Sequence, residues 1–205
     1  MSCGDFPKRL LLGGLTLLVA IAASGGARDP SVTADASVAV LDLEGRSVRP
    51  LEGLSAAASV FVFVRSDCPI ANRYAPELRR LQGRFGPSGV SFFVVYVDPS
   101  ESVEAIRRHR EDYGQPGSPL RDPEHALVRE AHAHVTPEAA VFAPGPRGPR
   151  LVYHGRIDDR AVDFGRERPA ATTHDLEDAL AAVLAGRPVP RETAPAVGCL
   201  ISDTR

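Results

Sequence analysis

The sequence predicts an α/β domain in which helices flank a central, mixed β-sheet, and three observations indicate it. Residues 59–64 and 90–97 are continuous apolar runs, the pattern of strands that are buried on both faces. A helical pattern follows each run, which is the order of a parallel βα unit. Residues 139–157 then hold two apolar runs around a proline- and glycine-rich turn, which predicts an antiparallel hairpin, and residues 173–184 predict a closing helix.

The length and composition predict one globular domain. The chain has 205 residues and is 43% hydrophobic, enough for one well-buried core but too short for two full domains with linkers. Its formal net charge of -2 excludes the basic footprint of a nucleic-acid-binding protein. We expect the domain over residues 37–186, a flexible lead-in at 28–36, and a proline-rich C-terminal segment at 187–205 that carries Cys199.

Residues 1–27 have the pattern of a secretory signal peptide. Lys8 and Arg9 form a short basic region, an uncharged apolar run follows at 10–23, and small residues follow that run. The run is shorter than the roughly 20 residues that span a bilayer, so we expect membrane attachment only if the segment stays uncleaved. The prediction is a periplasmic or otherwise extracytoplasmic protein, which loses Cys3 with the signal and keeps two cysteines in a compartment that permits disulfides.

The shorter elements follow from local patterns. They are a hairpin over 37–54, a helix from Ile70 to about Gly86, a helix over 100–113, and a helix over 123–133 with Asp122 as N-cap. Pro76 lies inside the first of these helices, where proline costs about 3 kcal/mol and usually causes a kink. Its presence there therefore needs a structural reason.

Cys68 lies at the junction between the first buried strand and the helix after it. A helix N-terminus stabilises a thiolate, which is the form of cysteine that attacks disulfides and peroxides. A lone cysteine is more often an inert buried residue, but this position favours a reactive thiol. Arg65 and Arg73 would add positive charge nearby and Asp67 would oppose it, and the sequence leaves the balance between them open.

Three local motifs resemble the thioredoxin fold. Cys68-Pro69-Ile70-Ala71 occupies the place of the family's Cys-x-x-Cys, and Pro76 matches the proline that kinks the active-site helix. Thr136-Pro137, just before a strand, is similar to the cis-proline that packs against the active-site cysteine. The order of elements and the amino-acid sequence of residues 37–201 resemble those of secreted bacterial redoxins of the alkyl hydroperoxide reductase and thiol-specific antioxidant type. This resemblance implies a thioredoxin-like sandwich.

The resemblance implies a thiol oxidoreductase in which Cys68 is the nucleophile for disulfide exchange or peroxide reduction. Thr136 and Pro137 would orient a partner's backbone. Its partners would be a protein thiol or disulfide, or a peroxide, together with a reductant that the sequence does not identify; no cofactor is implied. Glu138, next to the Thr-Pro step, is either a proton acceptor for the thiol or, by the commoner alternative, a surface carboxylate.

The chain also departs from the family patterns. Ala71 stands where the usual resolving cysteine would be, and Asn72 stands where copper chaperones of this fold have their second cysteine. Arg65 and Phe61 replace the Thr and Pro that precede the peroxidatic cysteine of a typical peroxiredoxin. The peroxidase assignment is therefore not supported by its own motif, and copper delivery is less favoured still.

Cys199 is the other cysteine of the mature chain, 131 positions after Cys68. It could resolve an intermediate on Cys68, or it could form a permanent disulfide, worth roughly 4 to 5 kcal/mol in the chain-entropy model. We favour the resolving role because a thiol of low pKa makes a labile disulfide. Gly198 would let the segment turn sharply toward the site. The alternative hypothesis is a catalytically silent binding module closed by a Cys68–Cys199 disulfide.

Four histidines and one charged cluster invite other interpretations. The spacing of His125, His132 and His134 does not put them on one helix face, so we predict no metal site, and His154 is predicted to be exposed. A charged cluster follows the last strand and is interpreted as a solvated loop, with a role near the site as the alternative. Its members are Arg156, Asp158, Asp159 and Asp163.

Overall fold

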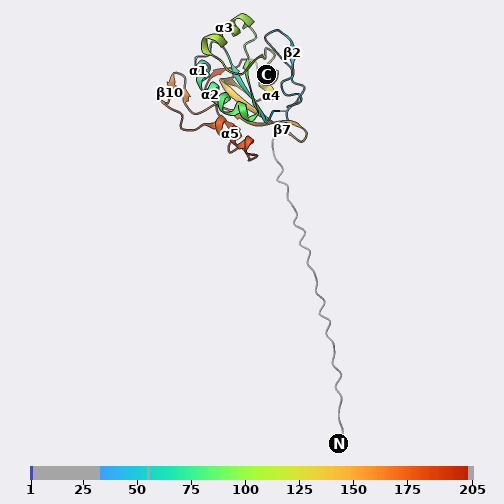
Figure 1. Cartoon of the computed structure of the whole chain (residues 1–205). Helices are drawn as coiled ribbons and strands as arrows, with labels where there is room; N and C mark the ends of the chain where they lie inside the picture. Colours follow the sequence, from blue (N-terminus) through green and yellow to red (C-terminus); the bar gives the residue numbers. More distant parts are fainter. Residues whose placement is uncertain (2–32, 55, 203–205) are drawn as a thin grey trace. The chain divides into compact units, whose positions relative to one another are not determined.

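The computed structural model describes residue 1 and residues 33–54 and 56–202. Contacts divide the chain into Met1–Pro30 and Ser31–Arg205, and the fold is that of the second unit (Figure 1). The predicted signal peptide, apart from Met1, lies outside the described residues. Within the part that is described, no helix has both the length and the apolar character needed to cross a membrane.

The centre of the domain is a mixed sheet of eight strands in the order β11-β8-β7-β3-β4-β5-β1-β2. The strands of this sheet are β1 (Val40–Leu41), β2 (Ser47–Val48), β3 (Ala58–Val64), β4 (Val90–Tyr96), β5 (Ser118–Arg121), β7 (Glu138–Gly145), β8 (Gly148–Gly155) and β11 (Thr193–Ala194). Two small sheets pair β9 (Ala161–Asp163) with β10 (Arg166–Glu167), and β6 (Val135–Thr136) with β12 (Cys199–Leu200).

The two apolar runs of the sequence are the parallel central strands β3 and β4, as predicted. The predicted hairpins are also present, as β1–β2 and β7–β8. Strand β5 was not expected, because Gly117 and Pro119 suggest a break in structure. It forms because β4 pairs with it on one side and β1 on the other, so tertiary pairing overrides a poor local pattern.

The helix predicted from Ile70 is two helices in the structure, α1 (Pro69–Arg73) and α2 (Ala75–Phe85), which meet at Tyr74. Pro76 causes the division because it has no N–H to donate to the Asn72 carbonyl. It occupies the first turn of α2, where a proline is tolerated. A short 3₁₀ turn, η1 (Gly86–Ser88), follows.

The starts of two other helices differ from the prediction. Helix α3 (Val103–Tyr113) begins at Ser102, which accepts a hydrogen bond from the Ala105 amide, because Ser100 is already bound to Asp98. Helix α4 (Ala126–Glu130) is shorter than expected and its N-cap is His125, although the Asp122 carboxylate accepts hydrogen bonds from two amides of its first turn. Helix α5 (Asp175–Leu184) closes the domain as predicted.

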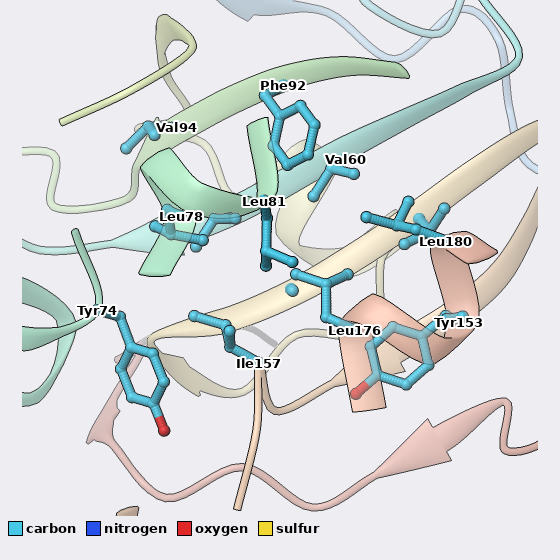
Figure 2. Close-up of a cluster of buried hydrophobic side chains, with 14 of the residues drawn as sticks. Val60, Tyr74, Leu78, Leu81, Phe92, Val94, Tyr153, Ile157, Leu176 and Leu180 are labelled. Atoms are coloured by element: carbon cyan, nitrogen blue, oxygen red, sulfur yellow. The ribbon is translucent and has the colours of Figure 1, made fainter. Parts of the chain in front are cut away.

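Alternation along β3 divides the core between the two faces of the sheet. Val60, Val62 and Val64 belong to a cluster with residues of α1, α2 and α5, part of which is drawn in Figure 2. Phe61 and Phe63 belong to a second cluster, with residues of α4 on the opposite face. Helices on both faces of a mixed sheet confirm the predicted α/β class and the thioredoxin-like sandwich.

The two ends of the described range 33–202 pack on the domain, the first against β8 and the second against β8 and β6. Thr33 forms a bridge with Arg150, and the Ala34 amide donates to the Pro149 carbonyl (2.7 Å), so the described part of the expected lead-in, residues 33–36, packs on the domain. At the other end, β11 runs parallel to β8 and β12 pairs with β6. The described part of the C-terminal segment, residues 187–202, is therefore part of the fold.

Candidate active site

Cys68 lies where the chain leaves β3 and enters α1. Its backbone N–H donates to the Arg65 carbonyl (3.2 Å), which closes a turn, and its residue is the N-cap of α1. The side chain is fully buried. Its Sγ donates a hydrogen bond to the backbone oxygen of Thr136 (3.0 Å), so the thiol faces the Thr136-Pro137 step. That peptide bond is cis, as expected.

Strand β12 brings Cys199 to the same place. Cys199 and Thr136 are paired residues of the antiparallel ladder between β12 and β6, and the Ile201 amide donates to the His134 carbonyl (2.9 Å). The Sγ atoms of Cys199 and Cys68 are 2.7 Å apart, and both residues are free cysteines. The two cysteines thus meet without any rearrangement of the backbone, although 131 positions separate them.

Gly198 is required for this approach. A Cβ atom at position 198 would lie 2.2 Å from the Thr136 oxygen and 2.7 Å from the Thr136 carbonyl carbon. Cβ contacts under 3.0 Å essentially never occur in proteins. The glycine therefore serves close packing of β12 on β6, and not the sharp turn that the sequence suggested.

The pKa values of the two thiols are shifted in opposite directions. Burial disfavours the Cys68 thiolate, but hydrogen bonds from the Cys199 thiol and the Ala71 backbone N–H, together with the contact to Thr136, outweigh it and lower the pKa of Cys68 below that of an ordinary thiol. Burial and the neighbouring Cys68 sulfur raise the pKa of Cys199 to about 12. Cys68 is therefore the more acidic thiol of the pair, and Cys199 donates a hydrogen bond to its sulfur.

The two arginines predicted near the thiol have carboxylate partners. Arg65 pairs with Asp67 (2.9 Å) and Asp98 (3.3 Å). Its positive charge lowers the pKa of Cys199, and the charge of Asp67 raises it with the larger effect. Arg73 pairs with Glu167 on β10. The structure therefore connects Arg65 electrostatically to the site, whereas Arg73 holds the β9–β10 hairpin.

Glu138 is neither a surface carboxylate nor bonded to a thiol in the structure. Only 5% of the residue is exposed, and its Oε2 accepts hydrogen bonds from the backbone amides of His134 (2.8 Å) and Val135 (3.2 Å). These amides lead into the Thr136-Pro137 step. Glu138 thus holds β6, the strand on which β12 packs.

The interpretation of residues 156–163 as a solvated loop is wrong for its two central carboxylates. Asp158 and Asp159 are 3% and 5% exposed. Asp158 accepts a hydrogen bond from the Tyr74 hydroxyl (2.6 Å), and Asp159 accepts one from the Thr172 amide (2.6 Å). The sequence could not show this, because each partner lies at least 13 positions away.

A small cleft that the sequence did not predict adjoins Pro137. Its lining comes from α1's C-terminal end, the segment after β8 and the approach to β12, namely Tyr74, Pro137, Arg156, Ile157, Asp158, Ala161, Ala196 and Val197. The cleft lies on the side of the cis-proline that carries the C-terminal segment.

The histidines singled out in the sequence do not form a metal cluster among the described residues. His132 and His134 are exposed, while His154, predicted to be exposed, is partly buried with its Nδ1 3.8 Å from Glu138. A different group has ligand atoms within 4.8 Å of one another, Glu77, His174 and Glu177. Its carboxylates are paired with arginines; these are Arg80, which contacts both, and Arg84.

A buried cysteine whose thiol pKa is lowered, a second cysteine in contact with it and an adjacent cis-proline on a thioredoxin-like sheet define the protein's class, a redoxin. The chain belongs to the AhpC/TSA family, whose model matches residues 30–146. The matched range includes Cys68, Thr136 and Pro137 and ends before Cys199. The family consists of thiol-dependent oxidoreductases, as the resemblance implied.

Two solved structures are similar over most of their length. An uncharacterized conserved protein from Geobacillus kaustophilus is 29% identical, with 84% of this chain and 96% of that chain covered and a TM-score of 0.66. A hypothetical protein from Sinorhizobium meliloti 1021 is 26% identical, with 82% and 92% covered and a TM-score of 0.67. No curated protein matches the chain.

Proposed function

We propose that the protein is an extracytoplasmic thiol oxidoreductase in which Cys68 is the nucleophile and Cys199 resolves the intermediate that forms on it. The observation that carries the proposal is the pair itself: two free sulfurs 2.7 Å apart with opposite acidities. A thiol of lowered pKa is more fully ionised at a given pH than an ordinary thiol and is also a better leaving group. A permanent structural disulfide needs no such asymmetry.

The pair supports the same two-step chemistry on either substrate. With a peroxide, the Cys68 thiolate attacks one oxygen and the O–O bond breaks, so Cys68 becomes a sulfenic acid and the other oxygen leaves as an alcohol or water after taking up a proton. With a disulfide, Cys68 attacks one sulfur and a partner thiolate leaves. Cys199 then loses its proton and attacks the Cys68 sulfur, which releases water or the second partner thiol and closes the Cys68–Cys199 disulfide.

Regeneration of the thiols begins at Cys199. Cys68 is fully buried, whereas Cys199 is partly exposed, so an external thiolate reaches the Cys199 sulfur first. Attack there expels Cys68, which is the better leaving group because its pKa is the lower of the two. A second thiol of the reductant then releases Cys199, and the reductant ends as a disulfide.

The experiment compares Cys199→Ser and Cys68→Ser with the parent, each with Cys3 replaced by Ser. One equivalent of hydrogen peroxide in the presence of dimedone should label Cys68 in Cys199→Ser, while oxidised glutathione should leave a stable glutathione adduct on it. The parent should close its disulfide with both reagents, and Cys68→Ser should react with neither. Faster reaction of Cys68 with hydrogen peroxide would indicate a peroxide substrate, and faster reaction with oxidised glutathione would indicate a disulfide substrate.

Two results would overturn the proposal. One is normal turnover by Cys199→Ser, which would remove Cys199 as the resolving residue. The other is a Cys68–Cys199 disulfide that resists dithiothreitol, which would support the silent binding module instead. The extracytoplasmic location rests on residues 1–27, and N-terminal sequencing of the protein from the expressing cells tests it by showing whether the chain begins after about residue 27.

A further inference from the structure

The turn before Cys68 is held through Ser66, which forms hydrogen bonds with Glu101 and with Asn72. Ser66 is the second residue of the turn that the Cys68 N–H closes on the Arg65 carbonyl. The Ser66 amide donates to Glu101 Oε1 (2.8 Å), and its hydroxyl contacts the same oxygen. Its carbonyl oxygen accepts a hydrogen bond from Asn72 Nδ2 (2.9 Å). The position of the turn therefore depends on Glu101 and on Asn72.

Asn72 belongs to α1, and its backbone N–H donates to the Cys68 carbonyl (3.1 Å). Its side chain thus connects the first turn of α1 back to the residue two positions before the nucleophile. Because Nδ2 is used on Ser66, Oδ1 faces the other way, toward Nε2 of His109 on α3 (2.7 Å). Because Oδ1 can only accept a hydrogen bond, His109 Nε2 must be the donor in this contact.

His109 is a buried histidine, 5% exposed, that the proposed reaction does not use directly. Burial lowers its pKa, which favours the neutral ring with one proton. That proton lies on Nε2, because Asn72 Oδ1 can only accept. Nδ1 then accepts from the hydroxyl of Tyr96 (2.9 Å), a residue at the end of β4 whose burial raises its pKa and keeps it protonated.

The four groups therefore form a chain of hydrogen bonds with a single direction. Tyr96 donates to His109, His109 donates to Asn72, and Asn72 donates to the Ser66 carbonyl. Every member is satisfied, and the chain connects the end of the central sheet with the turn before Cys68. A hydrogen-bonded network of this kind, buried at Tyr96 and His109 and partly buried at Asn72 and Ser66, favours one geometry.

We propose that Asn72 and His109 are positioning residues that hold the Cys68 turn in the geometry in which its thiolate is stabilised. The inference deepens the proposed function, on which it rests. The Ala71 amide that stabilises the Cys68 thiolate is the neighbour of Asn72 in the first turn of α1. Loss of the Asn72–Ser66 bond frees the turn and weakens that stabilisation. His109 acts only through Asn72, whose amide it orients.

The test is a titration of the Cys68 thiolate by its absorbance at 240 nm, whose result does not depend on how fast a reagent reaches the sulfur. The parent is the Cys3→Ser, Cys199→Ser protein, in which the introduced hydroxyl keeps a donor beside Cys68, and the same protein with Cys68→Ser supplies the background. We expect Asn72→Ala and His109→Phe each to raise the Cys68 pKa by about one unit, a tenfold smaller thiolate-to-thiol ratio. In Asn72→Ala, the further change His109→Phe should add nothing.

The matched control is Ile106→Ala, which removes a fully buried side chain of the same helix α3 without touching the network. It should lower the melting temperature at least as much as His109→Phe and leave the Cys68 pKa unchanged. If Ile106→Ala shifts the pKa equally, if the two network changes are additive, or if neither shifts the pKa, the inference is wrong. If His109→Phe does not fold, Asn72→Ala and the control decide alone.

Failure of the inference is distinguishable from failure of the proposed function. The parent pKa itself tests whether Cys68 is an acidic thiol, and its reaction with peroxide or oxidised glutathione tests whether it is a nucleophile. The difference between Asn72→Ala and the parent tests only the positioning. An ordinary parent pKa with an unchanged variant would overturn both, while a low parent pKa with an unchanged variant would overturn the positioning alone.

Discussion

Gly198→Ala should separate the two cysteines without altering either of them. The added Cβ would meet the Thr136 oxygen at 2.2 Å, and the atoms it meets belong to the backbone of β6, so no flexible side chain can move aside. An ordinary carbon–oxygen contact of about 3.3 Å requires β12 to move by roughly 1 Å. Cys199 lies one residue further along, and its Sγ moves with the strand.

We expect the equilibrium constant for closing the Cys68–Cys199 disulfide to fall about a hundredfold, the size of effect that misplacing a reacting group by about 1 Å can have. The assay is the equilibrium between the Cys68–Cys199 thiols and a dithiothreitol redox couple, followed by quenching and mass measurement. Gly83→Ala is the matched control, because no atom lies within 4 Å of the added Cβ in the interior of α2. A Gly198→Ala protein that closes its disulfide as readily as the control would refute the close-packing argument.

Three further variants test other contacts of the structure. Tyr74→Phe removes the 2.6 Å hydrogen bond to Asp158 and should lower the free energy of unfolding by about 2 kcal/mol in urea denaturation, whereas a change below about 0.5 kcal/mol would contradict that role. Asp159 has its pKa held well below the usual range, first by the Thr172 hydroxyl, so its contribution to stability is complete above the unfolded-state pKa and is lost as the pH falls through the folded value. Asp159→Asn should therefore lower the melting temperature at neutral pH, with a difference from the parent that shrinks below about pH 4 and not one that is constant with pH. Glu138→Ala leaves two backbone amides beside β6 without their acceptor, and hydrogen exchange of the β12 amides should speed up about tenfold; unchanged exchange would show that Glu138 does not hold this ladder.

The elements that the sequence predicted are those that local physics determines. The strands β3 and β4 are continuous apolar runs of seven residues each, rich in β-branched and aromatic side chains, which favours a buried strand over a buried helix. Strand β5 was missed because its formation depends on partners on both sides, one of which is about 80 positions away at Leu41. The division of the helix at Tyr74 follows from Pro76. The sequence predicted that this proline would kink one helix, whereas in the structure it separates two.

The candidate site divides in the same way. Cys68 and the Thr136-Pro137 step were predictable from short motifs, because each has a local reason to stand where it does. Cys199 was predictable only as the one other cysteine that follows the predicted signal peptide, and the family match ends well before it. The burial of Asp158 and Glu138 was not predictable, because each carboxylate is satisfied by groups whose positions depend on the whole fold.

Asn72 shows why an absent residue type is weak evidence about a site. In the sequence analysis, Asn72 mattered only because it occupies the position of the second cysteine of copper chaperones, which disfavoured copper delivery. In the structure its amide has a donor end and an acceptor end, and both are used, on Ser66 and on His109. A cysteine has neither the two ends nor the reach to make both bonds. The side chain at this position therefore has its own physical role, which is visible only once α3 has been placed beside α1.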